Sequence, residues 1–484
     1  MNGSGVFSNL IWRFAERIGA KLISVVVNLL LARLLAPELY GTVAIVTLIT
    51  DILQVFIESG FGTALIQKKD ADELDFSSVF FFNITAGVLL YILLFFAAPF
   101  IAQIYRRSDL TQFIRVVGLI LIISGLRNIQ QAYISRNMLF RCFFFSTLGG
   151  TVVAAFAGIY MAYKGYGVWA YVAQYLLNNF VGTAILWFTV KWRPKMQFSF
   201  QRLKGLFSYA WKLLASSILN TITEKIRPLI IGYRFTGSDL AFYNEGILFP
   251  NLIVENVNTS IDSVLLPALS QEQDRIENVK QMTHRAVQLG SYIMWPLMMG
   301  LFACARPLVS FALGENWLPC IPFIRIFCVY YALYPIHTAN LNAIKAVGRS
   351  DIFLRLEIIK KIEEFAIIIF TVFIGVKAMA YGVLAEGFVS LVINCWPGKK
   401  LYRYTIPEQI RDVLPSVVIS GIMCAVVSFV PLMGAPNLIT LALQVILGAA
   451  IYIGISYFSG LEVFQYLLST IKALLKKRSQ QELS

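Results

Sequence analysis

Charged residues are scarce in this chain: Asp, Glu, Lys and Arg together make up 14% of its 484 residues, whereas 58% are hydrophobic. Soluble globular domains carry about 25% charged residues. The shortage of charge therefore excludes an ordinary soluble fold. An all-α polytopic membrane protein is the class that this composition fits.

Histidine and cysteine are also rare. The chain has two histidines, His284 and His337, and its six cysteines show no CxxC spacing. Neither a metal site nor a disulfide framework is indicated. No P-loop, HExxH or nucleophile-elbow pattern is present, which favours a protein that is not an enzyme and holds no cofactor.

Long apolar runs are what the chain has in abundance. Runs of about twenty residues predict about fourteen membrane-spanning helices. The short connections between them leave no room for a separate extramembrane domain. The predicted spans are 9–35, 39–65, 77–104, 110–136, 142–163, 166–190, 206–233, 240–269, 281–313, 319–346, 352–376, 379–398, 410–432 and 436–458.

The net charge of +14 suits either nucleic acid or the anionic surface of a membrane. Counted from the N-terminus, the even-numbered connections are rich in Lys and Arg, as at 191–195 and 399–403, and the odd-numbered ones hold few. The positive-inside rule then places both termini in the cytoplasm. Basic loops beside anionic lipid account for the charge without nucleic acid. The helical spacing of apolar residues among basic ones in segment 461–484 predicts an amphipathic tail on the cytoplasmic side.

An internal repeat organises the middle of the chain. Three short patterns recur in the same order, each displaced by roughly 200–215 residues, which predicts two six-helix lobes related as parallel repeats. The lobes would be 1–195 and 196–405, followed by two extra spans within 406–460. The paired segments are 33–40 with 234–240, 113–115 with 323–325, and 166–170 with 381–385.

The first predicted span carries Arg13, Glu16, Arg17 and Lys21 inside its apolar run. The eleven residues between Lys21 and Arg33 span about 17 Å, well short of a roughly 30 Å hydrocarbon core, so a spanning helix must begin near Arg13. Arg13, Arg17 and Lys21 share one helical sector, with Glu16 at its edge. This sector should face protein or water because charge in lipid is costly.

The seventh span repeats this polar sector, as the internal repeat requires. Lys212, Glu224 and Arg227 lie on one face of it. Two interpretations follow from the residues. The two sectors line a water-filled cavity between the lobes, or they have a structural role. In the second case they form buried ion pairs that lock helices together, or the segment from Arg13 to Lys21 lies at the membrane interface as an amphipathic entry helix.

Acids spaced seven residues apart occur in two corresponding spans. Asp51 and Glu58 share a face of span two, and Glu255 and Asp262 share a face of span eight. Together with Glu16 and Glu224 they either bind a coupling ion, Na+ or H+, or neutralise the cationic sectors. The residues leave this choice open.

Several motifs resemble the polysaccharide-exporter branch of the MOP (multidrug/oligosaccharidyl-lipid/polysaccharide) superfamily, which includes colanic-acid, lipopolysaccharide, O-antigen and capsule translocases. They are LARLLAPELYG at 31–41, ESGFGTALIQKK at 58–69, GYGVWA at 165–170 and KWRP at 191–194. The resemblance covers nearly the whole chain. One departure is that Ala241 and Glu245 stand where the family commonly has glycine and a basic residue.

The resemblance implies a flippase of the bacterial inner membrane that moves an undecaprenyl-diphosphate-linked oligosaccharide, the repeat unit of a lipopolysaccharide or exopolysaccharide, by alternating access. It implies two lobes in a V around a central cavity, with a groove for the lipid tail at the last two helices. We expect a monomer that acts beside a polymerase and glycosyltransferases. The diphosphate or acidic sugar would be bound by Arg13, Arg17, Lys21, Lys212 and Arg227.

Two other functions remain as alternatives. A cation-coupled multidrug antiporter of the same fold usually offers organic cations an acidic, aromatic cavity, so cationic sectors count against it. A membrane polysaccharide polymerase or ligase commonly carries a large outer loop, which this sequence lacks.

Overall fold

The computed structural model describes the backbone of residues 3–470 and the side chains of Trp12 and residues 19–470. Within this range the regular structure is helical, with no strand, as backbone hydrogen bonding in a bilayer demands. Contacts divide the chain into two compact units, Met1–Ala241 and Phe242–Ser484. Each unit has its own core.

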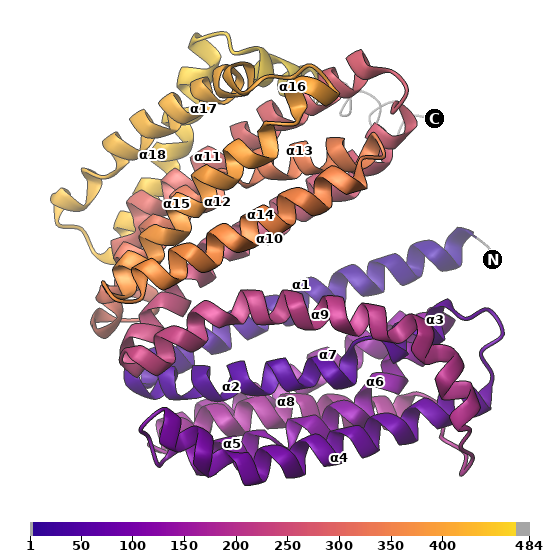
Figure 1. Ribbon diagram of the computed structural model, residues 1–484. Coiled ribbons are helices and arrows are strands. Elements are labelled where there is room, and N and C mark those ends of the chain that lie inside the picture. The colour runs from indigo at the N-terminus through magenta and orange to yellow at the C-terminus, as the bar shows by residue number, and fades with distance from the viewer. Residues whose placement is uncertain (1–2, 471–484) are drawn as a thin grey trace. The chain divides into compact units, whose positions relative to one another are not determined.

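The first unit consists of helices, and its long ones run alongside one another (Figure 1). They are α1 (Gly3–Leu34), α2 (Pro37–Glu58), α3 (Phe61–Gln67), α4 (Glu73–Ile104), α5 (Leu110–Val117), α6 (Ile120–Asn137), α7 (Phe140–Tyr163), α8 (Val168–Thr189) and α9 (Phe200–Arg234).

Aromatic and aliphatic side chains form the core of this unit. One cluster joins Phe61, Phe76 and Phe80 to Trp192 in the segment after α8. Helix α7 packs along α1 and α8, α4 along α6, and α2 along α6 and α9. Because α9 packs on α2, α3 and α4, it belongs to the first unit by its contacts. The predicted boundary between lobes at residue 195 stays a prediction.

The two copies of the repeated 33–40 pattern meet inside the first unit. A Cβ added at Gly41, at the start of α2, would lie 1.8 Å from the carbonyl oxygen of Gly237. Only a residue without a side chain permits so close a backbone approach. The position of Gly60, between α2 and α3, also calls for glycine, because its φ of +103° is strained for any residue with a side chain.

Helix α10 (Gly237–Gln271) starts in the first unit and continues into the second. The other helices of the second unit are α11 (Ile276–Ala312), η1 (Glu315–Cys320), α12 (Ile321–Ala332), α13 (Tyr334–Ala346), α14 (Ser350–Thr371), α15 (Val376–Cys395), α16 (Gly398–Leu401), α17 (Ile406–Val427), η2 (Val430–Met433) and α18 (Asn437–Phe458).

Helix α11 is the central packing element of the second unit, since it contacts α12, α13, α17 and α18. A buried polar network ties α13, α15 and α17 together. The Tyr402 hydroxyl donates to Asn340 Oδ1 at 2.7 Å, and Asn340 Nδ2 donates to Gln409 Oε1 at 2.8 Å. The Cys395 thiol also donates to Gln409 Oε1, at 3.0 Å. A buried network whose members are bonded to one another fixes the packing of its helices.

Each predicted span overlaps one helix or several in succession. Span four is divided into α5 and α6, and span ten into α12 and α13. Among residues 3–470, nine helical segments are long and apolar enough to cross a membrane. The predicted all-α polytopic membrane fold is therefore confirmed.

One packing contact is made in both units. The Arg115 guanidinium lies 4.1 Å from the ring centre of Phe95 on α4, and that of Arg325 lies 5.1 Å from the ring centre of Phe302 on α11. The two arginines end the repeated Phe-Ile-Arg pattern. Stacking on a ring lets a cation inside a membrane protein retain a partner.

Candidate functional site

The first acid of α2 pairs with a lysine of α9. Lys225 Nζ donates to Asp51 Oδ2 at 3.0 Å, and both side chains are about one-third exposed. Lys225 lies directly after Glu224 in the chain, but it is not part of the predicted cationic sector. The structure thus gives Asp51 a counter-charge that the sequence did not identify.

The second acid of α2 belongs to a hydrogen-bonded chain that crosses to α6 and α8. Ser124 Oγ donates to Glu58 Oε1 at 3.1 Å, and Gln54 Nε2 donates to Ser124 Oγ at 2.9 Å. The hydroxyl of Tyr175, on α8, reaches Gln54 Oε1 at 3.4 Å. Glu58 therefore has polar partners on a neighbouring helix.

Arg127 completes this polar region of the first unit. Its guanidinium donates to Asn179 Oδ1 at 2.8 Å and attracts the Glu58 carboxylate electrostatically. Arg127 was not among the candidate residues predicted from the sequence, although an arginine in the middle of the apolar run 110–136 is itself a signal of function. Gln54 could have been found too, because it shares a face of α2 with Asp51 and Glu58.

Asp262 of α10 has a neutral partner. Asn342 Nδ2 donates to Asp262 Oδ1 at 2.7 Å, and Thr338 Oγ1 donates to Asn258 Oδ1 at 2.8 Å. These bonds join α10 to α13, which are spans eight and ten. In the first unit the Glu58 bond joins spans two and four in the same way. Glu255 accepts from Asn251 of its own helix at 2.9 Å and is exposed.

The predicted cationic residues differ in how exposed their side chains are. Lys21 on α1 and Lys212 on α9 are exposed, as is Glu224. Arg227 is buried at 7% exposure, so Lys212 and Arg227 differ in access although they share a helical sector. Arg13, Glu16 and Arg17 lie outside the described side chains.

An apolar groove of about 520 Å³ opens between α11, α17 and α18. Its walls include Leu297 and Leu301 of α11, Met423 of α17, and Leu441 and Val445 of α18. Its lining includes two polar side chains. Gln444 Nε2 donates to the Val427 carbonyl at 3.1 Å, and the Tyr452 hydroxyl donates to the Tyr292 carbonyl at 2.8 Å. Gln444 Oε1 is buried without a partner among the described residues. The rest of the groove presents hydrocarbon.

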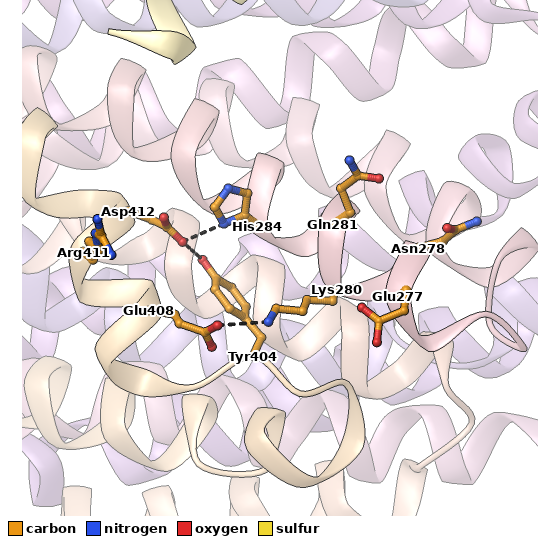
Figure 2. A pocket seen from close by; sticks show the side chains of 9 residues that line it. All are labelled: Glu277, Asn278, Lys280, Gln281, His284, Tyr404, Glu408, Arg411 and Asp412. Carbon is orange, nitrogen blue, oxygen red and sulfur yellow. Dashed lines mark hydrogen bonds and ion pairs between the residues drawn. The ribbon is translucent and has the colours of Figure 1, made fainter.

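A polar pocket of about 620 Å³ lies between the first turns of α11 and α17. Figure 2 shows His284, Tyr404 and Asp412 pointing toward one another, with Lys280 beside Glu408. His284 Nδ1 is 2.7 Å from Asp412 Oδ2, and Lys280 Nζ is 2.9 Å from Glu408 Oε1.

The Tyr404 hydroxyl donates to the same Asp412 oxygen. Burial and the neighbouring Asp412 carboxylate raise the pKa of Tyr404 well above its usual range, so this hydroxyl stays a neutral donor. Because Asp412, Glu408 and Lys280 are already paired, this pocket clamps α17 to α11.

The model of the polysaccharide biosynthesis protein family matches residues 30–322, more than half of the chain. The chain belongs to this family. The matched range includes α2, α9 and α10 with the acid pairs described above.

Curated relatives carry related descriptions. The teichuronic acid biosynthesis protein TuaB of Bacillus subtilis (strain 168) is 28% identical over 315 residues, which span 63% of this chain and 63% of TuaB. The succinoglycan biosynthesis transport protein ExoT of Rhizobium meliloti (strain 1021) is 22% identical over 81% of this chain and 77% of ExoT. The lipopolysaccharide biosynthesis protein WzxC of Escherichia coli (strain K12) is 23% identical over 75% of this chain and 74% of WzxC.

Solved structures share the fold of this family member. The lipid II flippase MurJ, in an inward closed conformation, superposes with a TM-score of 0.73 at 16% identity, covering 93% of this chain and 98% of MurJ. A multidrug resistance MATE transporter of the MOP superfamily, in an inward-facing conformation, superposes with a TM-score of 0.61 at 14% identity. The superposition covers 81% of this chain and 98% of the transporter. The predicted MOP-type membrane fold is confirmed.

Proposed function

We propose that this protein is a flippase that moves a lipid-linked oligosaccharide, a repeat unit of a surface polysaccharide, across the bacterial inner membrane by alternating access. The observation that carries the proposal is the apolar groove between α11, α17 and α18 in a member of a polysaccharide biosynthesis family. A free oligosaccharide is polar throughout and gains nothing from such a groove. An oligosaccharide attached to an isoprenoid chain does, because the chain packs against the hydrocarbon walls by van der Waals contact and brings no polar group that would stay unpaired there.

The cationic residues supply the second part of the proposal. A polyprenyl-linked sugar carries phosphate between its tail and its glycan, and Arg and Lys side chains bind phosphate by charge-assisted hydrogen bonds. Lys21 and Lys212 are exposed on helices of the first unit. Together with Arg13, Arg17 and Arg227 they are the proposed contacts of the diphosphate or of an acidic sugar. Paired Asp51 acts as a counter-charge in this scheme.

Filling the groove tests the function. Gly448 of α18 lines the groove, and a Cβ added there would lie 3.5 Å from Val427 Cγ2, which is ordinary contact. Gly448→Leu should therefore fold and place its side chain where the tail binds. We expect surface polysaccharide to fall at least about tenfold in a deletion strain complemented with this variant, a loss of about 1.4 kcal/mol or more in tail binding.

The matched control is Gly454→Leu on the same helix, because nothing lies within 4 Å of a Cβ at Gly454. It should restore polysaccharide fully, and immunoblots should show equal amounts of both variants in the membrane. Equal polysaccharide in the two strains would contradict the role of the groove.

A multidrug antiporter is the second candidate, favoured by the structural similarity to a MATE transporter. The same deletion strain separates the two functions. A flippase defect changes the surface polysaccharide and leaves resistance to cationic drugs unchanged. Drug sensitivity without a polysaccharide defect would favour the antiporter.

A further inference from the structure

Glu245 is a carboxylic acid buried inside the second unit. Its side chain lies on α10 and the residue is 3% exposed. Among the residues that the structure describes, its Oε2 atom has no hydrogen-bond partner. Tyr243 before it and Phe249 after it are also buried, so this stretch of α10 is covered by protein. Glu245 is thus distinct from Glu255 and Asp262 further along α10, which are exposed.

The surroundings of Glu245 are aromatic and apolar. The next residue, Gly246, faces Phe323 of α12 so closely that a Cβ on it would lie 2.3 Å from Phe323 Cβ. The Tyr243 ring packs edge-to-face on Phe323 at 6.0 Å and on Phe327 at 5.4 Å. The Phe242 ring of α10 packs edge-to-face on Trp317 of η1 at 6.0 Å, and Trp317 is 1% exposed. This part of α10 therefore packs directly on η1 and α12.

The charged groups of these elements are engaged or exposed elsewhere. The buried thiol of Cys320 interacts electrostatically with the Glu245 carboxylate and brings no positive charge. Arg325 of α12 lies over Phe302. Asp239 on the first turn of α10 bonds to Thr236. The remaining charged side chains of these elements and of the end of α11 are exposed: Glu315, Arg306, Glu255 and Asp262.

An ionised carboxylate is not stable in such a position. Burial without a cation or hydrogen-bond donors disfavours the charged form, and an acid so placed takes up a proton instead. Ionisable residues inside membrane helices are expensive to retain and commonly belong to proton or ion pathways. The protonated form of Glu245 fits the packed arrangement, and the ionised form fits only if water reaches it.

We propose that Glu245 is a proton-binding site of this protein. The acid holds its proton while α10 packs on η1 and α12, and it releases the proton when this part of α10 separates from them and water enters. Because α10 continues from the first unit into the second, the proton controls packing at the helix that connects them. This inference rests on the proposed flippase function and names the proton as the coupling ion.

Infrared spectroscopy tests the site without any transport substrate. The full-length protein in lipid nanodiscs at pH 7 should show the carbonyl stretching band of a protonated carboxylic acid. Glu245→Gln should lose this band, and the control Glu255→Gln, on the same helix but exposed, should keep it. Both changes are close in shape to glutamate, and size-exclusion profiles check folding. An unchanged band in Glu245→Gln would overturn the site.

Stability against pH gives a second readout. An acid that is neutral when folded and ionised when unfolded lowers stability as the pH rises. The melting temperature of the wild type should therefore fall between pH 5 and pH 8 by several degrees more than that of Glu245→Gln, while Glu255→Gln follows the wild type. If the melting temperatures of all three proteins changed equally with pH, Glu245 would not hold a proton in the folded protein.

Complementation then tests coupling. Glu245→Gln mimics the protonated state permanently, so it should accumulate in the membrane yet lose most surface polysaccharide, whereas Glu315→Gln, which changes an exposed acid of η1, should not. Full activity of Glu245→Gln would show that the proton plays no part in transport. If the infrared band behaves as expected while the Gly448→Leu strain keeps its polysaccharide, the proton site stands and the flippase assignment fails.

Discussion

At the residue scale, the acids of α2 illustrate how a partner decides the role of a charge. Asp51 and Glu58 share a helical face, as their spacing predicts. The structure adds a lysine to the first and a serine to the second. A carboxylate with an ammonium group 3.0 Å away is already neutralised. For Asp51 this favours the counter-charge interpretation over ion coupling, a choice that the sequence left open.

Exchanging the charges tests this interpretation. Asp51→Lys should destabilise the protein by about 1–3 kcal/mol, because it places two cations together in a half-buried site. Lys225→Asp should act similarly. The double variant Asp51→Lys/Lys225→Asp should regain most of the melting temperature and also the surface polysaccharide. A double variant that is stable yet inactive would show that Asp51 does more than balance Lys225.

At the element scale, the repeated 33–40 pattern has a packing explanation. Its first copy leads into α2 and its second into α10, and the two helix starts meet at Gly41 and Gly237. The sequence showed that the pattern recurs, but the repetition alone does not say that the copies touch. The contact depends on the course of α2 to α9, which brings segments about 200 residues apart to one place.

Gly41→Ala should therefore destabilise the protein. The added Cβ would meet a backbone carbonyl, which cannot move aside as a side chain can, and overpacking of this kind costs about 1–3 kcal/mol. Thermal unfolding of the purified protein measures the effect. Gly205→Ala on α9 is the control, because its Cβ meets nothing within 4 Å and alanine favours a helix by about 0.5–1 kcal/mol. If Gly41→Ala were as stable as the wild type, the close approach of Gly41 to the Gly237 carbonyl would be contradicted.

At the scale of the whole molecule, the basic connections predict how the protein is oriented in the membrane. Lys164, in the turn between α7 and α8, belongs to an odd-numbered connection, and Met196, between α8 and α9, belongs to an even-numbered one. Both side chains are exposed. The positive-inside rule assigns the second connection to the cytoplasm, with both termini.

Cysteine labelling checks this orientation. In a background without the native cysteines, Lys164→Cys should react with a membrane-impermeant maleimide added to spheroplasts. Met196→Cys should react only after the membrane is permeabilised. The reverse pattern would invert the topology and move the polar pocket of Figure 2 to the outer side.

The sequence by itself determined the membrane class, the positions of the helices and the faces that the acids share. These properties are local, because an apolar run and a seven-residue spacing need no information from elsewhere in the chain. The sequence also drew attention to Glu245 as a departure from the family pattern, without indicating its surroundings.

The tertiary structure decided which groups meet. Lys225 reaches Asp51 across 174 positions of the chain, and the apolar groove combines α11 with α17 and α18. The burial of Glu245 likewise depends on η1 and α12, which follow it by about 70 residues or more. Helical periodicity places a residue on a face, but packing between helices distant in sequence decides whether that face meets a charge, lipid or other side chains.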